Sequence, residues 1–276
     1  MRRSEELNRL VGAKDDVRGM RIGLSMLYCL GRPFPQLLTE LERVEAGCVE
    51  LVDEGGHSLN ERRVRALRRV IEDGGLEVTV HAPFVDVNIA SPVPTIRRAV
   101  LKRLKRSMLY AHELGSKVWV FHPGLHSSIA YFHPGLDWKL NIQSTRELLE
   151  AAEQLDTKIA IENIFDPSPF LLKSVEDFIR FYEELGSDAP GLAFDIGHAY
   201  INRQVAGFIE RLSDRIIHIH AHDNDGTSDS HKGIGYGGID WDWVINALKE
   251  AGYEGFIIVE SIEGVEESVE RLKRLL

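Results

Sequence analysis

Apolar positions along the chain follow two alternating patterns, one typical of buried strands and one typical of amphipathic helices. Short runs rich in Val, Ile and Leu, bounded by Gly, Pro or charged residues, indicate strands. The predicted strands span residues 21–29, 48–52, 77–81, 117–122, 157–162, 191–195, 215–220 and 255–260. Between them, apolar residues recur every three to four positions. The helices predicted from this spacing span residues 35–45, 60–72, 95–114, 139–154, 174–185, 205–212, 241–251 and 265–275.

Eight strands that are each followed by a helix make the (β/α)8 count of a TIM barrel. A barrel of about 250 residues uses nearly all of this chain. We therefore expect a single-domain α/β barrel over residues 20–276. Residues 1–19 are polar and lack an apolar period, so we interpret them as an N-terminal extension outside the barrel.

Six of the eight predicted strands end in a residue type that binds metal ions, and an apolar residue precedes each of the six. Because side chains alternate along a strand, these six share the parity that points into the barrel. The carboxyl ends of the strands carry the active site in this architecture. The six are His81, His122, Glu162, Asp195, His220 and Glu260.

Three further candidates follow strand ends, namely His198 and the loop pair Asp229 and His231. Carboxylate together with imidazole suits zinc, manganese or cobalt. Clustered carboxylates would repel one another without cations, which also favours metal binding. Nine ligands exceed what one ion can use. We therefore expect one to three divalent ions per chain, with some of the nine orienting substrate if fewer ions bind.

Other polar and aromatic residues near the strand ends are candidates for contact with a substrate. His222, Asp223 and His126 lie in the long loops that open at strand ends, and Phe84 follows His81 by three residues. Phe84 is also compatible with a place in the core. His218 has the inward parity of His220 and is expected inside the barrel.

Composition bounds the function without specifying it. The hydrophobic fraction of 43% supports a large core, and the net charge of -10 opposes non-specific attraction to nucleic acid. A local basic groove is compatible with an acidic whole, so the net charge does not exclude a nucleic-acid partner. No apolar run has the length of a membrane span, and the N-terminus does not have the pattern of a signal peptide. We expect a cytoplasmic protein that does not bind membranes. The sequence does not predict an oligomeric state.

On these residues the chain resembles the xylose isomerase-like TIM barrel superfamily, which includes the sugar phosphate isomerase/epimerase branch and the endonuclease IV-like branch (AP endonuclease family 2). The nine candidates match, in order and local motif, the nine ligands that hold three zinc ions in endonuclease IV. The HAPF motif, followed by Asn88, Ala90 and Ser91, and the FHPG motif also resemble that branch.

Other motifs resemble the sugar branch instead. The stretch HDNDGTSDSHKGIGYGGIDW is similar to the strand-seven loop of sugar phosphate isomerases and epimerases, and Glu162 opens ENIFDPSPF, where endonuclease IV continues differently. Ketose epimerases hold one metal with residues that correspond to Glu162, Asp195, His220 and Glu260, and a histidine at the position of His198 touches substrate. Their substrate-binding arginine has no counterpart here, since Gly226 lies in that region.

The expected function is therefore metal-dependent isomerisation or epimerisation of a small sugar or sugar phosphate through an enediolate. In this hypothesis Glu162 and Glu260 transfer the proton, and the resemblance implies a catalytic role for His198. The alternative is metal-dependent cleavage at apurinic/apyrimidinic sites in DNA, and only this alternative requires nucleic acid as a partner. A non-catalytic barrel is disfavoured because every ligand position is intact.

Overall fold

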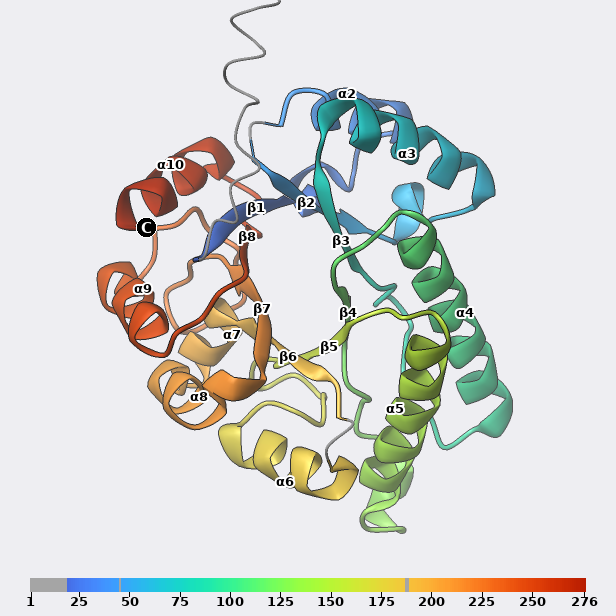
Figure 1. The fold of residues 1–276 in the computed structure, drawn as a ribbon. Helices are drawn as coiled ribbons and strands as arrows, with labels where there is room; N and C mark the ends of the chain where they lie inside the picture. The colour runs from blue at the N-terminus through green and yellow to red at the C-terminus, as the bar shows by residue number, and fades with distance from the viewer. Residues whose placement is uncertain (1–18, 45, 187–188) are drawn as a thin grey trace, which may run out of the picture.

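The computed structural model describes residues 19–44, 46–186 and 189–276, in which eight parallel strands close into a barrel (Figure 1). Each strand pairs with its neighbours in sequence, and β1 closes the ring against β8. The strands are β1 (Arg21–Ser25), β2 (Cys48–Val52), β3 (Glu77–His81), β4 (Trp119–Phe121), β5 (Ile159–Glu162), β6 (Gly191–Asp195), β7 (Ile216–Ala221) and β8 (Phe256–Val259).

Helices surround the ring on its outer side (Figure 1). They are α2 (Phe34–Leu41), α3 (Glu61–Gly74), α4 (Pro94–Glu113), α5 (Leu136–Gln154), α6 (Val175–Leu185), α7 (Ile196–Ile201), α8 (Val205–Leu212), α9 (Trp241–Glu250) and α10 (Val265–Leu275). The predicted single-domain (β/α)8 barrel is confirmed. Apart from Gly19, the predicted N-terminal extension lies outside the described residues. Among the described helices, none combines the length and the apolar composition that crossing a membrane requires.

Several element ends differ from the prediction by a few residues, and two differences involve short helices that directly follow a strand. The first strand ends at Ser25, because the Ser25 side chain accepts a hydrogen bond from the backbone of Leu27 and starts a 3-10 helix, η1 (Met26–Cys29). The six-residue helix α7 was not predicted. Its first turn is capped by Asp195, whose Oδ1 accepts from the His198 amide at 2.6 Å. Such a short helix has too few turns to produce a recognisable apolar period.

The barrel separates a large outer core from a small interior. Side chains of one parity, such as Phe121, Ile161 and Phe194, pack between the strands and the helices. The opposite parity on β5 and β6 places Ala160 and Ala193 inside the barrel, in a separate cluster. Glu162 and Asp195 have this inward parity, two residues further along each strand, so regular pleating alone directs the predicted ligands inward.

The loops that follow β3 and β4 are joined to each other by an amide side chain. Asn88 Oδ1 accepts from the backbone amides of Ala90 and Leu125, both at 2.9 Å. The Gly124 amide donates to Asn141 Oδ1 at 2.7 Å. The HAPF and FHPG motifs are therefore parts of one rigid wall beside the barrel mouth.

Substitution of Gly124 by alanine tests whether this wall must be tightly packed. A Cβ at this position would overlap the Ala90 side chain and lie 2.8 Å from the Ala90 nitrogen. We expect Gly124→Ala to lower the free energy of unfolding by about 1–3 kcal/mol, as overpacking of a close contact does. Urea denaturation measures this. Gly31→Ala is the matched control, because a Cβ there meets nothing within 4 Å. Equal stability of the two variants would contradict the expectation.

Candidate functional site

A pocket of about 280 Å³ opens at the barrel mouth, at the carboxyl ends of the strands. Its wall is partly aromatic and aliphatic, with Phe84, Phe165 and Phe170 placed against imidazole rings. The remainder of the lining consists of metal-ligating residue types. The full lining is Leu27, Val52, His81, Phe84, His122, Glu162, Ile164, Phe165, Phe170, His198, Asp229, His231 and Glu260.

The central cluster of the site consists of Glu162, Asp195, His220 and Glu260, which come from β5, β6, β7 and the end of β8. His220 Nδ1 lies 3.3 Å from Glu162 Oε1, 3.6 Å from Glu260 Oε2 and 4.0 Å from Asp195 Oδ2. All four side chains are buried. Three carboxylates therefore converge on one imidazole nitrogen.

A second cluster shares Glu162 with the first. The other oxygen of this carboxylate, Oε2, lies 3.2 Å from His81 Nε2 and 3.1 Å from His122 Nε2. His81 Nδ1 donates to the Ala82 carbonyl at 2.8 Å. This hydrogen bond fixes the orientation of the ring and directs Nε2 toward Glu162.

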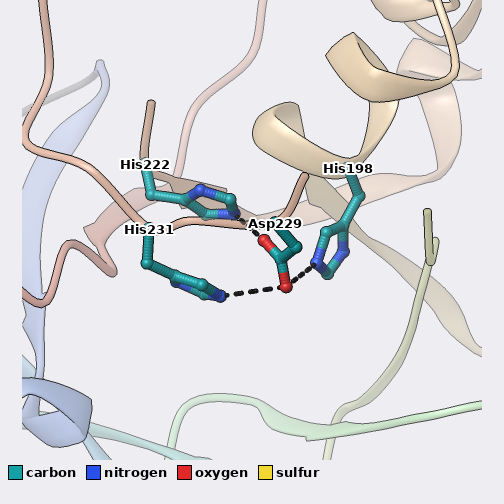
Figure 2. Close-up of side chains that lie close together, drawn as sticks. All are labelled: His198, His222, Asp229 and His231. Atoms are coloured by element: carbon teal, nitrogen blue, oxygen red, sulfur yellow. Dashed lines mark ion pairs between the residues drawn. The ribbon is translucent and has the colours of Figure 1, made fainter. Parts of the chain in front are cut away.

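A third group, here called the loop cluster, consists of His198, His222, Asp229 and His231. In Figure 2 the three rings surround the Asp229 carboxylate. His198 belongs to α7, whereas the other three residues belong to the loop between β7 and α9. The structure thus brings all nine predicted ligands into three adjoining clusters, and it adds His222.

The four predicted substrate contacts lie in different surroundings. Phe84 lines the pocket, and His222 belongs to the loop cluster. Asp223 is fully buried behind the pocket wall, where its carboxylate accepts from the Gly235 amide at 2.8 Å and from Trp241 Nε1 at 3.0 Å. His126 is largely exposed outside the pocket lining, with Nδ1 3.6 Å from Asp137 Oδ2.

Sequence reasoning missed Glu50, which is completely buried inside the barrel on β2. Its Oε2 accepts from Thr79 Oγ1 at 3.0 Å and from His218 Nε2 at 2.8 Å, and its Oε1 lies 2.9 Å from His220 Nε2. Contact on the Nε2 side turns His220 Nδ1 toward the central cluster. The available signal was a lone acid in the apolar strand CVELV, because an acid is almost never buried without a partner.

The clusters fit divalent metal ions by the chemistry of their atoms. Several buried atoms that point into them make no hydrogen bond to any described residue, including Asp195 Oδ2, His220 Nδ1 and His198 Nε2. Buried polar atoms without partners are costly, and carboxylates crowded together repel. A cation removes both penalties. Carboxylate oxygens with imidazole nitrogens suit zinc, manganese and cobalt.

Ionisation equilibria in the metal-free site reflect the same crowding. Burial opposes a charge on His198, but Asp195 and Asp229 outweigh it and raise the pKa of His198 to about 10. Glu162 likewise outweighs burial at His81, and Asp229 does so at His231. The pKa of each of these two imidazoles rises to about 9. Burial alone would raise the pKa of Glu162, yet the neighbouring imidazoles hold it well below its usual range.

Fold and site together define a TIM barrel with buried clusters of metal-ligating side chains. A model of the xylose isomerase-like TIM barrel family matches residues 38–275. The chain belongs to this family, which confirms the resemblance read from the strand ends.

Individual relatives are similar over nearly the whole chain. An uncharacterized protein of Methanocaldococcus jannaschii is 33% identical over 267 residues, which are 94% of this chain and 90% of the relative. A solved structure of a D-tagatose 3-epimerase-like protein is 31% identical with a TM-score of 0.87, covering 93% of this chain and 97% of its own. A D-psicose 3-epimerase of Enterocloster bolteae is 24% identical over 264 residues, which are 90% of this chain and 84% of that enzyme.

Replacing Glu50 should weaken metal binding at the central cluster. Glu50→Gln removes the charge beside His220 Nε2, so we expect affinity for Mn²⁺ or Co²⁺ to fall about 10- to 100-fold, as for other partners of metal-binding histidines. Competition with a chromophoric chelator measures this. Glu77→Gln, a partly exposed acid on the neighbouring strand, is the control and should bind like wild type. Unchanged affinity in Glu50→Gln would show that His220 needs no such support.

The stability of the metal-free protein should fall as pH rises above neutrality. Imidazoles have a pKa of about 6.5 in an unfolded chain, whereas those of His81, His198 and His231 are raised to about 9, 10 and 9 on folding. Their stabilisation is complete below pH 6.5 and is lost as the pH passes through 9 to 10. We expect the Tm of chelator-treated protein to decrease from pH 7 to pH 10 more steeply than that of metal-loaded protein. Parallel curves would contradict this.

Proposed function

We propose that the protein is a metal-dependent epimerase or isomerase of a small sugar or sugar phosphate. The observation that carries the proposal is the central cluster, in which Glu162 and Glu260 line a small pocket while Asp195 and His220 lie fully buried behind them. The relatives that are named as 3-epimerases support the same assignment.

The residues of the central cluster suit proton transfer next to a carbonyl group. A divalent ion bound there would polarise the carbonyl and acidify the adjacent C–H bond. Glu162 is the last residue of β5 and Glu260 directly follows β8, so the two carboxylates approach the pocket from different sides of the barrel. One removes the proton from one face of the substrate, and the other returns a proton to the opposite face. The aromatic wall of Phe84, Phe165 and Phe170 excludes water during this exchange.

The dimensions of the pocket support a small substrate. Its volume of about 280 Å³ lies at the lower limit of the roughly 300–1,000 Å³ that is typical of sites for drug-sized ligands. A single sugar matches this space. His198 lines the pocket and is the residue that we assign to contact with a substrate hydroxyl.

A second candidate function is metal-dependent hydrolysis of DNA at abasic sites. It is favoured by one specific observation, the gathering of all nine predicted ligands in adjoining clusters. Several neighbouring ions generate hydroxide and neutralise charge at phosphorus in such enzymes. The net charge of -10 and the small pocket favour the sugar reaction instead.

The role of Glu260 can be tested by hydrogen exchange in deuterated water. With metal-loaded protein and a panel of ketopentoses, ketohexoses and their phosphates, we expect wild type to incorporate deuterium at carbon into a substrate, measured by NMR. Glu260→Gln should lose this exchange by about 100-fold or more, the contribution typical of a general acid or base. Glu263→Gln, an exposed acid three residues further along, is the control.

Two outcomes would contradict the proposal. Full exchange in Glu260→Gln would remove Glu260 from proton transfer. Nicking of an abasic DNA duplex by the metal-loaded wild type, without exchange on any sugar of the panel, would replace the epimerase assignment with the endonuclease.

A further inference from the structure

Asn163 directly follows β5, at a point where the pairing between two strands of the barrel ends. The last residues that pair between β5 and β6 are Glu162 and Ala193, so this ladder ends two residues before Asp195. The Asn163 side chain continues the pairing. Its Oδ1 accepts from the Asp195 amide at 2.8 Å, and its Nδ2 donates to the Asp195 carbonyl at 2.9 Å. One amide side chain therefore takes the place of a strand beside the end of β6.

This contact uses both the acceptor and the donor of the amide. Asn163 and Asp195 are completely buried, so loss of either hydrogen bond is costly. An ionised carboxylate of the same shape accepts but does not donate, and an aliphatic side chain does neither. The end of β6 is therefore matched to asparagine at position 163.

The hydrogen bonds continue from Asp195 to His198 and back to Asn163. Asp195 Oδ1 accepts from the His198 amide at 2.6 Å, and this bond caps α7. His198 Nδ1 lies 2.9 Å from the Asn163 carbonyl oxygen. Because a carbonyl only accepts, His198 Nδ1 carries the hydrogen. The three residues thus form a closed set of hydrogen bonds, here called the asparagine clamp.

The asparagine clamp determines which atoms of Asp195 and His198 face the site. Asp195 Oδ1 is engaged by the His198 amide, whereas Asp195 Oδ2 makes no hydrogen bond to any described residue and lies 4.0 Å from His220 Nδ1. Since His198 Nδ1 is bound to the Asn163 carbonyl, Nε2 is the nitrogen that is left for a substrate. One carboxylate oxygen and one imidazole nitrogen are therefore held in a fixed relation.

We propose that Asn163 is a positioning residue, which holds the metal-binding oxygen of Asp195 and the substrate-binding nitrogen of His198 in place. Asn163 lies outside the pocket lining and acts through these two residues. This role rests on the proposed function, because the central cluster must hold the ion. Loss of the Asn163 amide should loosen Asp195 and His198 together.

Asn202 provides a matched control on the same side of the barrel. Its Nδ2 donates to the carbonyls of Ile164 and Lys173, both at 3.0 Å, and its Oδ1 accepts from the Asp166 amide at 2.8 Å. Within the described part of the chain, the Asn202 side chain makes no hydrogen bond to the asparagine clamp. Asn202→Ala therefore removes side-chain hydrogen bonds to the loop after β5 but leaves the clamp intact.

The experiment measures binding of Co²⁺ alone to the full-length chain. The proteins are wild type, Asn163→Ala, Asn202→Ala, Asp195→Asn and the double variant Asn163→Ala/Asp195→Asn. Competition with a chromophoric chelator gives the affinities, and the binding step that Asp195→Asn weakens identifies the central cluster. Urea denaturation gives the stability of each protein. In the metal-free proteins, nitrogen-edited NMR follows exchange of the His198 Nδ1 hydrogen with water.

We expect Asn163→Ala to bind Co²⁺ at the central cluster about tenfold more weakly or worse, as on loss of other residues that orient metal ligands. In the Asp195→Asn background the same substitution should have little further effect on affinity, because it acts through Asp195. The His198 hydrogen of Asn163→Ala should exchange about tenfold faster, since the clamp opens more often. Asn202→Ala should lose stability but keep the wild-type affinity and exchange rate.

Several results would overturn the proposal. They are wild-type Co²⁺ affinity or His198 exchange in Asn163→Ala, a full additional loss of affinity in the double variant, and equal losses of affinity in Asn163→Ala and Asn202→Ala. If Asn163→Ala does not fold, Asn163→Ser provides the same comparison, because its short hydroxyl cannot make both contacts. Wild type that binds no Co²⁺ would overturn this role and the proposed function together. Absence of sugar epimerisation alone would refute only the proposed function, since no measurement here uses a sugar.

Discussion

The concentration of ionisable side chains at one end of the barrel is the constraint on which the rest of the structure depends. Glu50, Glu162, Asp195 and Glu260 are all buried within a few ångströms of imidazole rings. Burial of this many charges is tolerable only if each has a partner of opposite charge or a bound cation. The barrel supplies rigid strand ends that keep these side chains together. The apolar outer core stabilises the strands against the repulsion between the buried carboxylates.

The fold and most of the site could be predicted because both depend on periodicity. The alternation of strands and helices determined the barrel, and the parity of each strand determined which terminal side chain points inward. Asp195 and His220, which pair in register on β6 and β7, illustrate this. Their apolar predecessors, Phe194 and Ile219, lie in the outer core.

The parts that could not be predicted depend on contacts between residues distant in sequence. Glu50 faces His218 and His220 across the barrel interior, 168 and 170 positions away. No local sequence pattern indicates a contact between residues so far apart in the chain. Asp223 illustrates the opposite error, because its loop position suggested substrate contact. The Asp223 carboxylate accepts hydrogen bonds from the Gly235 amide and the Trp241 indole. This part of the sugar-branch motif therefore shapes the loop rather than the pocket surface.

Glu162 contributes one oxygen to each of two clusters, with Oε1 toward His220 and Oε2 toward His81 and His122. A metal ion bound to one oxygen of Glu162 would withdraw electron density from the other oxygen and restrict the rotation of the carboxylate. If metal ions bind at both clusters, their binding would be thermodynamically linked, and each ion would change the affinity for the other by the same factor. The availability of one metal in the cell would thereby control how tightly the protein holds a second.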